Sequence, residues 1–297
     1  MKIENGVLVK YTGNLQNVEI PYGVTAIGEE AFLECINLNS INIPNGVISI
    51  GRWAFAGCKN LKSVTIPNSV TDLGEGAFLG CPNLKNIKIQ DNSKLEKINV
   101  GTFAGCDGLY DIVIPDGVRY LCSGECRRYT LRAKNCNVPF EECEDCGYYK
   151  GIGAFENCKN LRSVTVNLPL SCIGVRAFAN CINLTSVNIT RIPEPELYSE
   201  FGVYYAICKS AFEGCSSLNQ IIIPYGVTSI GNRAFANCIN LYNVIIPNSV
   251  TFIGNNAFEN TPIQQFWKSR NLCQYCGGSF HGVFNKKCMR CGRMKDY

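Results

Sequence analysis

The chain has few of the residues that most catalytic and membrane functions require. Its 297 residues include one histidine, His281, and only 18% are charged. No uninterrupted apolar run reaches the ~18 residues that a membrane-spanning helix needs. The glycines form no G-x-x-x-x-G-K-[ST] phosphate-binding loop, and the carboxylates form no convergent pair. We therefore do not expect an enzyme, because residues 1–267 also contain no histidine to act as a base. The lack of a long apolar run likewise argues against a membrane protein.

An export signal is also missing from the N-terminal stretch MKIENGVLVKYTGN, which has no apolar centre and no cleavage-site pattern. Nineteen cysteines would suggest disulfides in an exported protein. Without such a signal, reduced thiols and metal sites are favoured, and we expect a cytoplasmic protein. The net charge of +4 and the hydrophobic content of 46% exclude a disordered polycation.

An internal repeat of about 23 residues fills most of the chain. Around an Ala-Phe pair runs I-P-x-x-V-x-x-I-G-x-x-A-F-x-x-C-x-x-L-x-x-I-x-I, clearest at 43–66 and 223–246. The pair itself recurs at Ala31-Phe32, Ala54-Phe55, Ala77-Phe78, Ala154-Phe155, Ala177-Phe178, Ala211-Phe212, Ala234-Phe235 and Ala257-Phe258. No single repeat can bury its own apolar face, so neighbouring repeats must stack into a solenoid.

Each repeat predicts one strand and one short helical segment. Alternation in residues 40–43 is typical of a strand with one buried face, and Pro44 ends that strand. The glycine at positions such as Gly51 turns the chain into a helical segment that places Ala, Phe and Cys on one face. We expect about ten parallel strands, the last near Phe266, and an extra hairpin at 3–13 covering the first turn.

The V-T-x-I-G-x-x-A-F-x-x-C-x-x-L-x-x-I-x-I-P pattern, with its G-V-L-x-K-Y-T-G opening, resembles the BspA-type bacterial leucine-rich repeats. The resemblance covers roughly residues 1–267. It implies a right-handed β/α leucine-rich-repeat solenoid that binds partners and does not catalyse. Many members of that family are surface or secreted adhesion proteins, so surface adhesion is one alternative function.

Eight cysteines share one repeat position. They are Cys35, Cys58, Cys81, Cys106, Cys158, Cys181, Cys215 and Cys238. We expect them to fill a tight internal slot, because free cysteine is among the most buried residue types. The alternative is a ladder of redox or metal-binding thiols.

The tail, residues 268–297, carries two C-x-x-C pairs separated by eleven residues. Cys273, Cys276, Cys288 and Cys291 predict a tetrahedral four-sulfur zinc site of the closed, structural kind. The segment resembles the short zinc ribbons that end many bacterial proteins. Seven basic residues against one acid give this tail a net charge near +6, which makes nucleic-acid binding a second alternative function.

Two insertions interrupt the repeat, near 119–149 and near 191–205. The first holds the spacing of a second zinc site, formed by Cys122, Cys126, Cys143 and Cys146. The alternative is a loop with reduced, unligated thiols. The second insertion is aromatic and contains Tyr198, Phe201 and Tyr204, either as a contact element for a partner or as a lid on the solenoid.

Strand residues that face away from the core line the concave sheet, the usual binding surface of a solenoid. In one outward row the last three members, Ile222, Ile245 and Trp267, are all apolar and lie in consecutive turns, and we expect them to form a contact surface. The alternative is that the zinc ribbon folds back and covers them. Our main hypothesis is a non-catalytic scaffold that binds a protein partner here, with one structural zinc ion or two.

Overall fold

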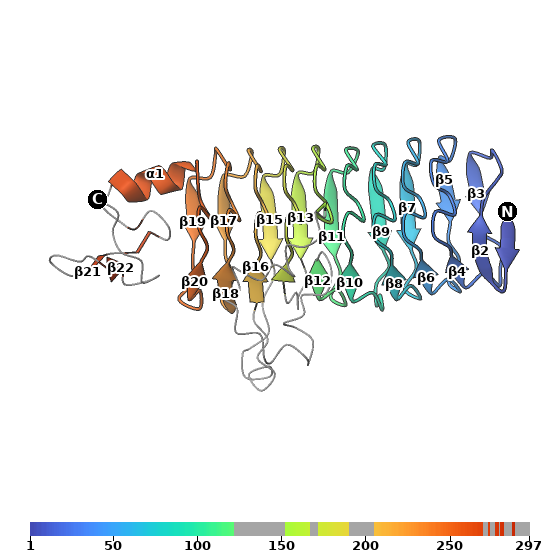
Figure 1. Ribbon diagram of the computed structural model, residues 1–297, viewed down its shortest axis with the longest axis horizontal. Coiled ribbons are helices and arrows are strands. Elements are labelled where there is room, and N and C mark those ends of the chain that lie inside the picture. Colours follow the sequence, from blue (N-terminus) through green and yellow to red (C-terminus); the bar gives the residue numbers. More distant parts are fainter. Residues whose placement is uncertain are drawn as a thin grey trace, which may run out of the picture.

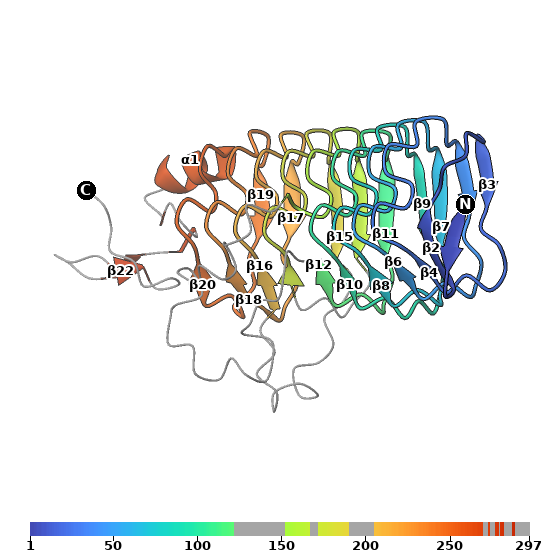
Figure 2. The same cartoon turned by 45° about the vertical axis from the view of Figure 1, so that its right-hand side comes forward.

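The computed structural model describes residues 1–121, 152–166, 172–189 and 205–269, and in the tail residues 273, 277–278, 280–281 and 287–288. Successive repeats stack along one axis as the turns of a solenoid (Figure 1). Nine turns are described, each built from two strands, of which the first is the longer in all turns but one, and the two sets run as separate rows along the stack (Figure 2).

The longer strands carry the outward rows predicted from the sequence. They are β3 (Asn17–Glu19), β5 (Ser40–Asn42), β7 (Ser63–Ile66), β9 (Asn86–Ile89), β11 (Asp111–Ile114), β13 (Ser163–Val166), β15 (Ser186–Ile189), β17 (Gln220–Ile222) and β19 (Asn243–Ile245). Pairing is parallel and in repeat register, so that Val64 lies beside Ile87. Equivalent side chains therefore stack on one another, and the inward ones form a continuous core.

A second strand in each turn, shorter in all turns but one, was not predicted. These strands are β4 (Ala26–Ile27), β6 (Ser49–Ile50), β8 (Asp72–Leu73), β10 (Lys97–Ile98), β12 (Tyr120–Leu121), β14 (Cys172–Ile173), β16 (Tyr205–Ile207), β18 (Val227–Ile230) and β20 (Phe252–Ile253). Most are two residues long, too short for alternation to mark them. They exist because the neighbouring turn offers hydrogen-bonding partners at the same height.

The predicted N-terminal hairpin is confirmed. Strand β1 (Lys2–Glu4) pairs antiparallel with β2 (Val7–Lys10), and β2 pairs in parallel with β4 of the first turn. The hairpin turns at Asn5 and Gly6, both with positive φ. It covers the first short strand, which would otherwise present an open edge.

The predicted short helical segments are wrong: in the described turns, hydrogen-bonded turns replace them. The residue before Ala and the second residue after Phe both have positive φ, for example Trp53 at 54° and Gly57 at 69°. These left-handed residues interrupt any right-handed helix. The amides of this segment bond to the next turn, as when the Phe32 amide donates to the Ala54 carbonyl at 2.7 Å. The segment therefore joins neighbouring turns as a third hydrogen-bonded face.

The predicted last strand near Phe266 is also wrong, because residues 262–269 form helix α1 (Pro262–Ser269). Thr261 stands where other repeats have cysteine, and its hydroxyl accepts a hydrogen bond from the Gln264 amide at 3.3 Å. A threonine cap followed by proline at the first helical position is a strong helix start. Ile263 and Trp267, four residues apart, are the buried face of α1.

The centre of the core is one unbroken stack of aromatic rings. Nine phenylalanines from successive turns stack with ring centroids 4.9–5.5 Å apart. Tyr11 stacks on Phe32 at the N-terminal end, and Trp267 meets Phe258 edge-on at the other. The stack therefore has an aromatic cap at both ends.

The repeat cysteines lie in the core, as expected, except that Cys35 in the first turn is only half-buried. Each thiol from the second turn onward bonds to a phenylalanine carbonyl in the preceding turn; Cys58, for example, lies 3.2 Å from the Phe32 carbonyl oxygen. Burial raises the pKa of Cys106 and Cys158 well above the usual range. The position selects a small apolar side chain that can still donate one weak hydrogen bond.

Candidate binding surfaces

Ile222 and Ile245 lie side by side on the outward face of β17 and β19. The two residues are register partners, and 62% and 52% of their surfaces are exposed. Neighbouring turns present polar residues at this position, such as Thr165 and Asn188. An exposed pair of large aliphatic side chains on a polar sheet has no role in the core, so we name Ile222 and Ile245 the outward isoleucine pair.

The third predicted member of this surface, Trp267, lies elsewhere. Because residues 262–269 form a helix, Trp267 does not continue the outward row, and only 6% of it is exposed. Its indole packs against the Phe258 ring and lies so close to Gly277 that a Cβ there would come within 2.6 Å of Nε1. Trp267 therefore caps the core and contacts the start of the tail.

Several predicted residues lie outside the described part of the chain. They are Tyr198, Phe201, Tyr204, Cys122, Cys126, Cys143, Cys146, Cys276 and Cys291. The described residues contain no group of three or more potential metal ligands. Two of the four ribbon cysteines are described, Cys273 and Cys288, and both are buried.

The backbone at Cys273 forms a tight loop that closes at Gly277 and Gly278. The Gly277 amide donates to the Cys273 carbonyl at 2.7 Å, and the Cys273 amide donates to the Gly278 carbonyl at 2.8 Å. Gly277 has φ of 69°, a conformation that glycine adopts without strain. Strands β21 (Phe280–His281) and β22 (Lys287–Cys288) pair antiparallel, which brings Cys288 into a hairpin. Two of the four predicted zinc ligands, Cys273 and Cys288, therefore lie in this loop and this hairpin.

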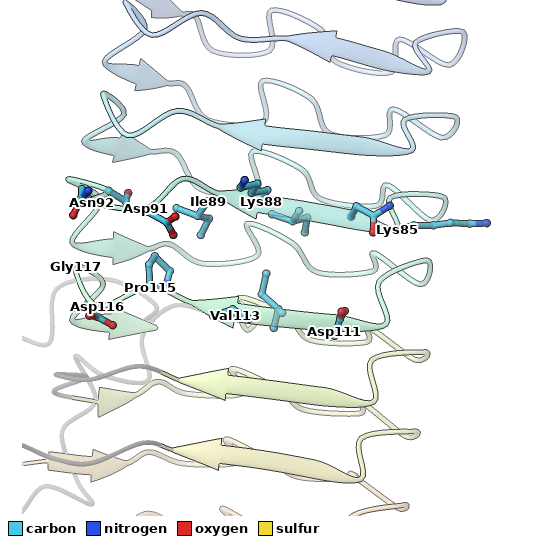
Figure 3. Close-up of a pocket in the computed structure, with 14 residues that line it drawn as sticks. Lys85, Lys88, Ile89, Asp91, Asn92, Asp111, Val113, Pro115, Asp116 and Gly117 are labelled. Carbon is cyan, nitrogen blue, oxygen red and sulfur yellow. The ribbon is translucent and has the colours of Figure 1, made fainter.

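A cleft that sequence reasoning missed divides the long-strand sheet. Strands β9 and β11 are not paired, and neither are β8 and β10, so both rows of strands break at the same place. The cleft has a volume of about 650 Å³. Figure 3 shows Lys85 and Asp111 at the end of the cleft where β9 and β11 begin, and Asp91, Asn92 and Asp116 at the opposite end.

The signal for this cleft was the repeat length. Ile66 and Ile89 are 23 residues apart, whereas Ile89 and Ile114 are 25 apart. The two extra residues enlarge the corner after β9 and shift the following strands out of register. Asn99 compensates in the core, because its side-chain amide donates to the Leu73 carbonyl at 2.7 Å. In the preceding turn a backbone amide, that of Gly74, makes the equivalent bond to Ile50 at 2.8 Å.

Ion pairs between turns lie on the third face, where no sequence pattern predicted them. Glu156 is buried, and both its oxygens accept hydrogen bonds from Arg176, at 3.0 and 2.5 Å. Two turns further on, Arg233 pairs with Glu213 and with Glu259. Burial opposes ionisation of Glu213, but hydrogen bonds from Arg233 and Ser210, together with the charges of Arg233 and Arg176, outweigh it and lower the pKa of that carboxyl. These pairs join neighbouring turns, and each of their three carboxylates is matched by an arginine.

Stacked turns with a leucine, an Ala-Phe pair and a parallel strand in each define a leucine-rich-repeat protein. The family model of the BspA type leucine rich repeat region matches residues 2–126, 134–198 and 204–288 in six copies, and the chain belongs to this family. The described residues contain no helix long and apolar enough to cross a membrane.

Solved structures of other leucine-rich-repeat proteins are similar to this chain. A leucine rich cell surface protein from Faecalibacterium prausnitzii A2-165 is 27% identical over 83% of this chain, with a TM-score of 0.45. This chain spans 57% of the length of that structure. A leucine-rich repeat protein from Bacteroides ovatus is 25% identical over 84% of this chain and 77% of its own, with a TM-score of 0.33. The T. pallidum leucine rich repeat protein is 22% identical over 79% of this chain and 82% of its own, with a TM-score of 0.49. Comparison with curated proteins found no match.

Proposed function

We propose that the protein is a non-catalytic scaffold that binds a protein partner through the outward isoleucine pair. The observation that carries this proposal is the in-register exposure of Ile222 and Ile245 on a sheet face that is otherwise largely polar. Large apolar side chains in adjacent positions are a typical anchor of a protein interface. Repeat solenoids bind their partners along such extended faces.

The test is affinity capture with the double variant Ile222→Ser/Ile245→Ser, compared with the wild-type chain. Ile48→Ser is the matched control, because Ile48 is as exposed as Ile245, at 52%, but lies outside the longer strands. We expect a partner that the wild type and the control both retain and the double variant loses. The same set of captured proteins from all three would remove this surface from consideration.

We further propose that Cys273, Cys276, Cys288 and Cys291 hold one structural zinc ion. The tight loop at Cys273, the hairpin of β21 and β22 and the burial of Cys273 and Cys288 support this. Four thiolates make a closed tetrahedral site without an open position for a substrate. When bound, the ion would stabilise the tail as a cap on the last turns.

Metal analysis of the reduced chain tests this proposal. We expect about one zinc per chain if only these cysteines bind, and about two if Cys122, Cys126, Cys143 and Cys146 form a second site. The variant Cys273→Ser/Cys288→Ser should lose one equivalent and leave any second one in place. An unchanged zinc content in that variant would contradict the assignment.

A further inference from the structure

The outer edge of β19, the last long strand, faces away from the rest of the sheet. In a parallel ladder a strand presents its backbone groups alternately to its two neighbours. The Ile223 amide donates to the Ile245 carbonyl at 3.0 Å, so Ile245 faces β17. The groups of Val244 and the amide of Ile246 therefore point to the opposite edge.

Where two consecutive long strands are paired, the following strand satisfies the equivalent groups. The Ile20 amide, for example, donates to the Asn42 carbonyl at 3.2 Å, and Ile246 occupies the position of Ile20 in its own turn. In the described part of the chain, no further long strand pairs with β19 on this side. The chain makes one bond, from the Ile263 amide to the Leu241 carbonyl at 3.1 Å, and then leaves as α1 (Figure 1).

Four backbone groups along this edge have no hydrogen-bond partner in the described part of the chain: the Tyr242 carbonyl, the Val244 amide and carbonyl, and the Ile246 amide. Natural sheets protect such edges with charged side chains or proline. Residues 242–246, Tyr-Asn-Val-Ile-Ile, contain neither, whereas β3 at the other end of the row of long strands carries Glu19. The β19 edge is therefore the less protected end of that row.

We propose that this edge binds an extended segment of a protein partner, which adds to the sheet as one more parallel strand. The inference rests on the proposed protein-binding function and names the form of the partner. The added strand would place one side chain beside exposed Ile245 and the next beside half-buried Val244. Both neighbours are aliphatic, so the segment that fits is uncharged and rich in β-branched or aromatic residues.

The test measures binding of labelled peptides to the full chain by fluorescence anisotropy. One peptide copies residues 240–247 (NLYNVIIP), and a second copies residues 60–67 (NLKSVTIP). The second has lysine, serine and threonine in place of Tyr242, Asn243 and Ile245. We expect the first to bind at least tenfold more tightly. A scrambled version of the first peptide should not bind.

Backbone methylation separates strand addition from contact between side chains. Methyl groups on the peptide amides equivalent to Asn243 and Ile245 would face β19 and should abolish binding. A methyl group on the amide equivalent to Val244 faces away and should leave binding unchanged. In the protein, Val244→Pro removes a donor that no described residue uses, and it should also abolish binding.

The inference is overturned if the first peptide does not bind or if both methylated peptides bind equally. It is also overturned if sedimentation shows a dimer of the wild-type chain that Val244→Pro abolishes, since the occupant would then be a second copy. These failures are distinct from failure of the proposed function. Capture that depends on Ile222 and Ile245 without peptide binding would leave the scaffold proposal standing and reject strand addition.

Discussion

The Trp267 indole meets the Phe258 ring edge-on, with 5.3 Å between ring centroids and 84° between ring planes. Every phenylalanine pair before it stacks nearly parallel, at 20° or less. The perpendicular indole therefore ends a stack that a further parallel ring would continue. The core of a repeat protein must end in this way, because its last turn has no neighbour to bury it.

Trp267→Ala should expose Phe258 and lower the free energy of unfolding by about 3–5 kcal/mol, the usual cost of truncating a buried aromatic residue. Phe266→Ala is the control, because the adjacent ring lies on the same helix and is 51% exposed. It should change stability by about 0.5 kcal/mol or less. Urea unfolding followed by circular dichroism measures both. Equal effects would contradict the capping role of Trp267.

The thiols of the buried repeat cysteines should resist alkylation in the folded chain. Burial raises the pKa of Cys106 and Cys181 well above the usual range and that of Cys238 to about 12, so the reactive thiolate is scarce at neutral pH. Cys35 should react first, because it is only half-buried and nearby Lys10 partly offsets the rise in its pKa. Mass spectrometry after a short iodoacetamide pulse gives the order. Labelling of Cys106 at the rate of Cys35 would refute this order.

The ion pair between Glu213 and Arg233 should make stability depend on acid pH. The pKa of Glu213 is lowered from 4.5 in the folded chain, so its contribution is present above 4.5 and is lost as the pH falls through the lower folded value. Glu213→Gln should therefore destabilise the chain at neutral pH and flatten the loss of stability below 4.5. Thermal unfolding across this range measures it. Glu19→Gln, at an exposed strand position, is the control and should retain the wild-type slope.

Asn99→Ala should destabilise the turn at the cleft between β9 and β11. It would leave the buried Leu73 carbonyl without its donor, at a cost of about 1–3 kcal/mol. Asn68→Ala removes a similar side chain at an exposed position in the preceding turn and should cost about 0.5 kcal/mol or less. Chemical denaturation of the two variants compares them. A loss from Asn68→Ala as large as that from Asn99→Ala would argue against this role of Asn99.

The sequence by itself determined the stacking of turns, the inward residues and the N-terminal hairpin. Stacking brings each position against the same position of the next turn, so one clear repeat such as 43–66 describes the core of all turns. Buried Phe55 and Cys58 were predictable for this reason. The longer strands were predictable because alternation over four residues is a local signal.

Only the tertiary structure decided the features whose partners lie in a neighbouring turn. The Phe32 amide bonds to the Ala54 carbonyl, 22 residues away, and this choice replaces a helix with a ladder of turns. The two-residue strands exist for the same reason. The sequence predicts an exposed Trp267 only if the strand pattern continues past Thr261 and Pro262. A helix begins there instead and turns Trp267 into the core. The local sequence pattern shows which side chains are apolar. The backbone conformation that carries those side chains depends on the hydrogen bonds between turns.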